Sequence, residues 1–447
     1  DVAADDAAAG AADSKAEEVV EQEEEEFYIG ALDQGTTSTR FVLFDRNQVA
    51  VAQHQLEHQQ FHPQPGWCEH DPMELLENAR LCMQHAVAKL RAALREAAGA
   101  GAAPPDLDDE EEAQAFVKAK VRAIGITNQR ETTVVWERRT GRPLHRAIVW
   151  LDLRTQAIAD RLAKKFGPDA FRKTCGLPIN SYFSALKLRW LLENDDAVAR
   201  AASEYNCCFG TVDTWLIYNL TGGRDGGAFV TDITNASRTM LMSLYTLQWD
   251  EASCARLGIY RSMLPRIASN AEKYGVVTEG TMKGVPICGC LGDQHAALLG
   301  QRCLEGQAKN TYGTGCFLLM NTGEQPIQSY QGLLTTTAFQ LGPRESAQYA
   351  LEGSVAIAGA GVNFLKDNLH FIEEAHEIEE LASSVESSAG VTMVPALSGL
   401  FAPHWEEAAR GTLFGMTQFS TKAHVARALL EGIAQMSREV LDAMQLD

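Results

Sequence analysis

The chain has 447 residues, of which 45% are hydrophobic and 22% are charged, and its formal net charge is −20. This length suits two domains that each bury a core, and the composition is typical of an ordinary globular protein. The acidic balance argues against a nucleic-acid binder or a basic membrane-surface protein, and no apolar run is long enough to span a bilayer. We therefore expect a cytoplasmic two-domain protein with reduced cysteines and with neither a nucleic-acid nor a membrane partner.

Two acidic segments carry most of the negative charge. Residues 1–26 are rich in Ala and Glu and lack aromatic side chains, a composition that predicts a disordered tail. A second stretch, residues 97–120, is rich in Ala, Gly and acidic residues and is expected to be a low-complexity surface insertion. We interpret both as solvated spacers.

The first structured stretch, residues 29–45, predicts a β-hairpin whose turn has a function. An apolar run leads into Asp33-Gln34-Gly35-Thr36-Thr37-Ser38-Thr39-Arg40, and a second apolar run follows. A carboxylate at a strand end suits Mg²⁺, while small hydroxyls and free backbone N–H groups suit phosphate oxygens. Arg40 would add a bidentate phosphate contact. The alternative is an ordinary hairpin with a Thr-rich turn.

A helix is expected from Pro72 onward, with Asp71 as its N-cap. Around its start, four histidines are scattered through polar sequence and are expected to be solvated: His54, His58, His62 and His70.

Two strands in the next segment end in residues whose side chains suit ligand binding. The strand expected at residues 121–127 is followed by Arg130 and Glu131. Chemistry in layered α/β proteins tends to lie at strand ends, and this pair offers donors and acceptors to a ligand with several hydroxyls. The alternative is a surface ion pair. The strand at residues 147–150 ends at Trp150, which would wall a pocket for an aliphatic backbone.

A further strand, residues 285–292, delivers Asp293 and Gln294 to the start of a helix. Asp293 is then either a helix cap or a general base, and the pattern leaves both open. Cys288, Cys290 and His295 lie close by in the sequence, but the two cysteines alternate as in a strand and a fourth metal ligand is missing. We expect these three side chains to pack in the core.

The hairpin pattern recurs at residues 310–320, where a Gly/Thr turn that includes Thr314 feeds an apolar strand. A small-residue stretch at 353–361 would let the backbone approach a flat ligand closely, or would start a helix packed against a sheet. Two such hairpins, each opening a long α/β segment, suggest a duplicated architecture that grips a nucleotide between its halves. No Walker motif or dinucleotide glycine fingerprint is present, so nucleotide binding rests on the two hairpins.

These motifs, in this order, resemble those of the glycerol kinases in the FGGY family of carbohydrate kinases, which shares the ATPase core of actin and hexokinase. The resemblance runs from about Tyr28 to the last residue. It is carried by residues 33–40, 125–133, 209–217, 231–240, 292–294 and 310–317, and by both family signatures, at 182–194 and 411–431. The Asn-Gln-Arg-Glu-Thr-Thr run at 128–133 points to glycerol kinases rather than pentulose kinases.

The resemblance implies an α/β fold of two ribonuclease H-like domains of the actin and hexokinase type, with mixed sheets flanked by helices and a cleft between the domains. The N-terminal domain would cover residues 27–303 and the C-terminal domain residues 304–447. Because the family's glycine-rich adenosine motif and final helices would follow Asp447, the C-terminal domain is expected to be incomplete at its end. The family also implies a homodimer or homotetramer.

The resemblance further implies phosphorylation of glycerol to sn-glycerol 3-phosphate, with ATP and Mg²⁺ as cofactors. Asp293 would be the catalytic base and would organise Mg²⁺ together with Asp33. Glycerol would contact Arg130, Glu131, Trp150, Tyr182, Asp293 and Gln294. The nucleotide would contact Thr36, Thr37, Ser38, Arg40, Thr314, Gly359 and Asn363, the last in place of a glutamine that many relatives have.

Two alternatives remain open at this level. One is a kinase of the same family that acts on another polyol or ketose, which a substrate panel would reveal. The other is an actin-like nucleotide switch that transfers no phosphate. The Arg130-Glu131 and Asp293-Gln294 pairs argue against a switch, because a switch has no use for a triol pocket.

Overall fold

The computed structural model describes residues 26–99, 110–406 and 408–447. Apart from Glu26, the predicted acidic tail lies outside these ranges, as do residues 100–109 of the predicted insertion. None of the helices within the described ranges combines the length and the apolar character that a bilayer span requires.

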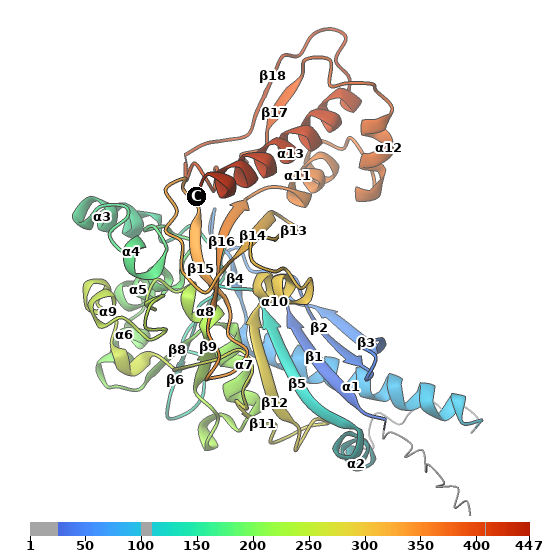
Figure 1. The fold of residues 1–447 in the computed structure, drawn as a ribbon, viewed down its shortest axis with the longest axis vertical. Coiled ribbons are helices and arrows are strands. Elements are labelled where there is room, and N and C mark those ends of the chain that lie inside the picture. The colour runs from blue at the N-terminus through green and yellow to red at the C-terminus, as the bar shows by residue number, and fades with distance from the viewer. Residues whose placement is uncertain (1–25, 100–109, 407) are drawn as a thin grey trace, which may run out of the picture.

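A mixed six-stranded sheet forms the centre of the first domain (Figure 1). The hairpin predicted at residues 29–45 is its β1–β2 pair, and β5 and β12 run parallel to β1 on the other side. The strand order is β11 (Gly275–Val276), β12 (Pro286–Gly292), β5 (Val121–Asn128), β1 (Tyr28–Gln34), β2 (Ser38–Phe44) and β3 (Ala50–Glu57).

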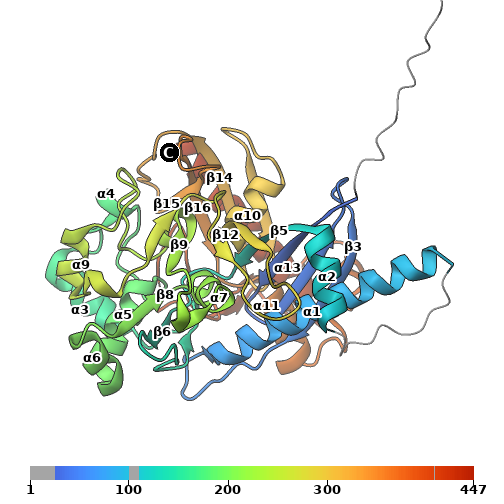
Figure 2. The same cartoon turned by 90° about the horizontal axis from the view of Figure 1, so that it is seen from below.

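Helices cover this sheet and build a second lobe beside it (Figure 2). The long helix α1 (Pro72–Ala97) begins as predicted, because the Asp71 side chain accepts a hydrogen bond of 2.8 Å from the Met73 N–H. Apart from α2, described below, the α-helices of this lobe and sheet are α3 (Gln156–Phe166), α4 (Arg172–Cys175), α5 (Ser184–Asn194), α6 (Asp196–Ser203), α7 (Val212–Leu220), α8 (Ile233–Ser237), α9 (Glu251–Leu257) and α10 (Asp293–Gly300).

Three short two-stranded ladders join the lobe to the sheet. They pair β4 (Glu69–His70) with β7 (Ala147–Ile148), β6 (Val134–Glu137) with β8 (Cys207–Gly210), and β9 (Val230–Asp232) with β10 (Arg266–Ala268).

The described part of the predicted insertion at 97–120 is mostly helical. Residues Glu110–Lys120 form helix α2, with Ala113 and Val117 buried and Phe116 stacked on Tyr28 at 6.5 Å between ring centroids. Apolar residues three and four positions apart share one helix face, and three glutamates in the first turn favour the helix dipole. The acidic composition concealed this apolar face, so the expectation of a low-complexity surface insertion missed this packed helix.

An antiparallel four-stranded sheet forms the second domain. Its order is β13 (Ala308–Tyr312), β14 (Cys316–Gly323), β16 (Gln348–Val355) and β15 (Leu334–Phe339). Helix α13 (Lys422–Leu446) packs on β14 and β16 and lies at the top of the molecule in Figure 1. Around it are α11 (Gly359–Asn363), α12 (Ile378–Ser383) and the ladder of β17 (Thr392–Val394) with β18 (Thr412–Phe414).

The two domains share a close interface. The Thr335 N–H donates to the Gly176 carbonyl at 3.1 Å, and the Tyr349 hydroxyl donates to the Leu244 carbonyl at 2.6 Å. Gly176 has a φ of +78°, and a Cβ there would lie 2.1 Å from the Thr335 oxygen, so this approach requires glycine. The division predicted at residues 303 and 304 falls in the turn between α10 and β13.

Candidate active site

Three parallel strands bring the predicted site residues to one edge of the first sheet. Gln34, Asn128 and Gly292 are register partners at the carboxyl ends of β1, β5 and β12. The hydroxyl-rich turn, the Arg130-Glu131 pair and Asp293 follow these strands directly. This edge is where layered α/β proteins bind their ligands.

The motif at residues 231–240 braces this edge. Thr234 Oγ1 accepts a hydrogen bond of 2.9 Å from the Gly292 N–H, and Asn235 exchanges side-chain amide hydrogen bonds of 3.0 Å with Asn128. The Asp232 carboxylate accepts from the Thr234 N–H at 2.7 Å and from Asn235 Nδ2 at 2.6 Å. The strand ends that precede Arg130 and Asp293 are thereby tied to each other.

A buried acidic cluster lies beneath the brace. Ligand atoms of Asp213, Asp232 and Cys290 lie within 4.8 Å of one another. Burial and the neighbouring Asp232 raise the pKa of Asp213 above its usual range. Each of the four carboxylate oxygens already accepts a hydrogen bond from a Thr or Asn side chain. We therefore interpret the cluster as an anchor for the brace rather than a metal centre.

The turn after β1 carries the predicted phosphate contacts. Asp33 and Arg40 are cross-strand partners, and their partly exposed side chains form an ion pair of 2.8 Å. Trp150 Nε1 donates to Thr36 Oγ1 at 3.0 Å, while Thr37 is exposed. Exposed ion pairs are weak, so either side chain can leave the Asp33–Arg40 pair and bind a ligand of opposite charge.

Two of the four histidines expected to be solvated are instead buried behind this turn. His58 Nε2 lies 2.9 Å from the Thr36 carbonyl oxygen, and its ring packs edge-on against His70 at 4.6 Å between centroids. Burial lowers the pKa of His58 and lowers that of His70 to about 3, so both rings are neutral at pH 7. His58 therefore anchors the Thr36 backbone as a neutral donor, a role that scattered polar spacing does not reveal.

The predicted Arg130-Glu131 pair is half of a buried four-residue network. Arg130 donates two hydrogen bonds to Glu352 of β16, at 2.6 and 2.7 Å, and its side chain is 2% exposed. Glu131 accepts from Arg238 Nε at 2.6 Å, and Arg238 Nη2 lies 3.4 Å from Glu352. Although burial opposes it, the two guanidinium groups hold the pKa of Glu352 well below its usual range. The alternative of a surface ion pair was wrong.

This network crosses between the domains and constrains the backbone at the site. Glu131 has a φ of +61°, a conformation that is costly for a residue other than glycine and that the surrounding contacts sustain. Glu352 was not predicted, because no sequence pattern marks it. Arg238 lies in the motif at residues 231–240, but no role was predicted for it.

Asp293 begins helix α10 and faces the cleft. Its Oδ1 accepts from the Gln294 N–H at 2.7 Å and lies 3.5 Å from Arg130 Nε. A third of the side chain is exposed, and that surface opens into the cleft between the domains. Burial raises the pKa of Asp293 to about 6, against the opposing effect of the Arg130 guanidinium. At pH 7 the group is mostly an ionised carboxylate that can accept a proton.

A cleft of about 190 Å³ unites these groups. Aromatic rings wall it: Trp150 lies 5.8 Å from Tyr182 and 5.9 Å from Phe317 between centroids. Its lining residues are Thr36, Thr37, Arg130, Glu131, Trp150, Tyr182, Asp293, Gln294, Thr311, Gly313, Thr314 and Phe317. Nine of these were predicted site residues, and the other three come from the β13–β14 hairpin.

The remaining predicted residues lie outside this lining. Asp33, Ser38 and Arg40 belong to the β1–β2 hairpin next to Thr36 and Thr37. Gly359 packs on the second hairpin turn: its N–H donates to the Gly313 carbonyl at 2.9 Å, and a Cβ there would meet that oxygen at 2.7 Å. Asn363 is exposed at the end of α11. Their predicted nucleotide contacts stay predictions.

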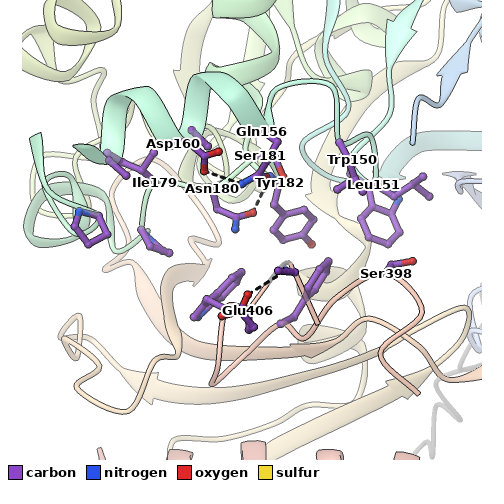
Figure 3. Close-up of a pocket in the computed structure, with 18 of the residues that line it drawn as sticks. Trp150, Leu151, Gln156, Asp160, Ile179, Asn180, Ser181, Tyr182, Ser398 and Glu406 are labelled. Carbon is purple, nitrogen blue, oxygen red and sulfur yellow. Dashed lines mark hydrogen bonds between the residues drawn. The ribbon is translucent and has the colours of Figure 1, made fainter. Parts of the chain in front are cut away.

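A larger cavity of about 710 Å³ adjoins the cleft and shares Trp150 and Tyr182 with it. In Figure 3, Gln156, Asp160 and Tyr182 face Ser398 and Glu406 across this cavity. The Asp293 carboxylate and the Arg130-Glu131 pair are not among its lining residues. The smaller cleft is therefore the candidate active site.

Family models and curated proteins match most of this chain. The model of the FGGY family of carbohydrate kinases, N-terminal domain, matches residues 28–300, and that of the C-terminal domain matches residues 308–447. A glycerol kinase of Arabidopsis thaliana is 52% identical over 94% of this chain and 77% of its own length. A glycerol kinase of Methylorubrum extorquens is also 52% identical, over 94% of this chain and 79% of its own length.

Solved structures share the fold. A Plasmodium falciparum glycerol kinase with ADP superposes with a TM-score of 0.79 at 38% identity, covering 94% of this chain and 79% of that one. A gluconate kinase of Lactobacillus acidophilus gives a TM-score of 0.75 at 22% identity, covering 94% of this chain and 78% of that one, which is a likeness of fold alone.

Proposed function

The chain belongs to the FGGY family of carbohydrate kinases, and from this premise we propose that it transfers the γ-phosphoryl group of ATP to glycerol, forming sn-glycerol 3-phosphate and ADP. One observation carries the proposal: a single cleft contains Asp293, the buried Arg130-Glu131 pair and the hydroxyl-rich turn with Thr36. The names of the similar proteins favour glycerol as the acceptor.

Most of the groups that bind glycerol belong to the first domain. Glu131 and Asp293 offer carboxylate oxygens to its hydroxyl hydrogens, while Arg130, Tyr182 and Gln294 complete the polar contacts. The Trp150 ring lies beneath the carbon chain, where apolar contact suits C–H groups. The buried network around Glu131 supports this proposal because it holds the binding groups in one arrangement before substrate arrives.

The phosphoryl transfer needs positioning more than covalent help. A terminal glycerol oxygen attacks the γ-phosphorus, the bond to the β,γ-bridging oxygen breaks, and the hydroxyl proton passes to the Asp293 carboxylate. The transition state is loose, so the base contributes less than the alignment and charge neutralisation around the phosphates. A cleft between two domains also excludes water when it closes, which limits hydrolysis of ATP.

The nucleotide lies between the two hairpin turns. Thr36, Thr37 and Ser38 bind the β- and γ-phosphates from the first domain, and Arg40 neutralises their charge. Thr314, Gly359 and Asn363 contact the nucleotide from the second domain. The likeness of the two turns, each following a strand and rich in Gly and Thr, supports this arrangement.

The donor set fits Mg²⁺. Asp33 and Asp293 provide carboxylate oxygens at the same sheet edge, both partly exposed, and hard oxygen donors suit this ion. When bound with the nucleotide, Mg²⁺ supplies charge neutralisation at the β- and γ-phosphates. Asp33 would then release Arg40 toward the phosphates.

The homodimer or homotetramer stays a prediction from the family resemblance, and the cytoplasmic location stays a prediction from composition and cysteine usage. Light scattering coupled to size-exclusion chromatography measures the mass of the assembly and tests the first of them.

The function is tested by quantifying ADP released from MgATP with and without glycerol, beside a panel of other polyols and ketoses. We expect release that depends on glycerol and exceeds that with the other acceptors. Stronger ADP release with a different polyol or ketose would identify that compound, and not glycerol, as the substrate. Binding of ATP with no acceptor-dependent release from any compound would instead support a nucleotide switch.

A further inference from the structure

A buried lysine lies behind the cleft and has no assigned role. Lys309, on β13, is 3% exposed, and its ammonium donates to three acceptors: Gln294 Oε1, Thr311 Oγ1 at 2.9 Å and the Phe317 carbonyl at 3.2 Å. An ammonium has three hydrogens and no lone pair, so these contacts use its whole donor capacity.

Lys309 remains charged at neutral pH. Burial and the nearby Arg130 lower the pKa of Lys309 to about 8, while the Glu352 and Asp293 carboxylates oppose that shift. A buried charge is costly, and three well-placed acceptors offset that cost. Because a charged ammonium can only donate, each of its three partners must accept the hydrogen bond through an oxygen.

Two of these partners, Gln294 and Thr311, line the cleft. Because Gln294 Oε1 accepts from the ammonium, the amide cannot turn over without placing its own N–H₂ against a cation. Gln294 Nε2 therefore remains as the donor of this amide. Thr311 likewise uses an oxygen lone pair on Lys309, which leaves its hydroxyl hydrogen free to donate.

We propose that Lys309 is a positioning residue that sets the hydrogen-bond polarity of one cleft wall, so that Gln294 and Thr311 present donors to a hydroxyl oxygen of glycerol. Two other lining residues, Glu131 and Asp293, present acceptors. A hydroxyl both donates and accepts, so it can bind both kinds of group, whereas a ligand group that can only donate or only accept cannot. This inference rests on the proposed function, because it takes glycerol as the occupant of the cleft.

The test is a double-mutant cycle between Lys309 and the pair Gln294 and Thr311, which accept its hydrogen bonds. The variants are Lys309→Met, Gln294→Leu/Thr311→Val, and all three together, with KM for glycerol, KM for ATP and kcat measured for each. We expect Lys309→Met to raise KM for glycerol about tenfold and to leave KM for ATP within about twofold, since a lost hydrogen bond is worth about one decade in affinity. In the Gln294→Leu/Thr311→Val background, Lys309→Met should change KM for glycerol by less than about twofold, because residues that act as one unit are not additive.

Two further variants separate positioning from folding. Lys309→Arg keeps the cation and should restore part of the affinity for glycerol, which a neutral side chain of similar volume should not. Lys366→Met removes a partly exposed lysine whose partner is Asp367 and should leave every constant unchanged. Thermal unfolding with and without ATP checks that each variant is folded.

Several results would overturn the inference. Full additivity in the cycle, or equal losses for glycerol and ATP, would make Lys309 a general structural residue. Wild-type affinity for glycerol in Gln294→Leu/Thr311→Val would show that Gln294 and Thr311 do not contact the substrate. If the wild-type chain releases no ADP in response to glycerol, the proposed function fails first and the inference fails with it.

Discussion

Replacing Asp293 with Asn removes the proposed base at nearly constant volume. The amide oxygen can still accept the hydrogen bond that the carboxylate accepts from the Gln294 N–H at 2.7 Å, and Arg130 keeps its bidentate partner Glu352. We therefore expect the fold to persist. A positioned base contributes roughly 10²–10⁴-fold to the rate, so kcat should fall by at least about that factor.

The pKa of Asp293 gives the same prediction a pH dependence. Burial raises this pKa to about 6, and the ionised form is the one that accepts the proton. Activity should therefore be full above pH 7 and fall as the pH drops through 6. At pH 5 about a tenth of the carboxyl groups are ionised, so kcat/KM for glycerol should be about a tenth of its value at pH 8. The residual activity of the Asn variant should not vary across this range.

The assay is direct quantification of ADP after quenching, because coupling enzymes have pH dependences of their own. Asp367→Asn, at an exposed surface pair, is the matched control and should behave as wild type at every pH. Near wild-type turnover of Asp293→Asn would refute the role as base. Loss of activity below pH 6 that persists in the Asn variant would assign the titration to another group.

Three further predictions concern the network and the metal. Glu131→Gln should raise KM for glycerol more than KM for ATP, because we assign its carboxylate to glycerol and not to the nucleotide; equal rises would contradict its assignment. Glu352→Gln leaves two buried guanidinium groups without a full counter-charge and should lower the free energy of unfolding by about 3–5 kcal/mol, measured with urea. The control Glu431→Gln, at a surface pair, should cost about 0–1 kcal/mol, and a similar cost for both would refute the argument from burial. Chelation by EDTA should abolish ADP release and added Mg²⁺ should restore it, with Asp33→Asn needing more Mg²⁺; an unchanged requirement would remove Asp33 from the metal site.

Much of the fold could be predicted from local pattern. The two Gly/Thr hairpins, the strands that end before Arg130 and Asp293, and the start of α1 at its Asp71 cap all formed as expected. Each depends on side chains within a few residues of one another, which is the range over which periodicity, capping and turn chemistry act.

Other features escaped local reading because their causes are distant in the chain. Helix α2 emerges from an acid-rich segment only where its apolar face meets the sheet, and His58 and His70 lose their solvent only when the turn after β1 packs over them. In both cases, tertiary packing overrode what composition alone suggested.

The sequence by itself determined most of the chemical groups that reach the cleft, because strand ends and turn residues specify them locally. The tertiary structure alone decided how those groups are held. Arg130 and its partner Glu352 are 222 residues apart, and Lys309 meets Gln294 across two elements of different domains. Such pairs leave no spacing to read, since a buried charge selects its partner by proximity in space and by the cost of remaining unpaired.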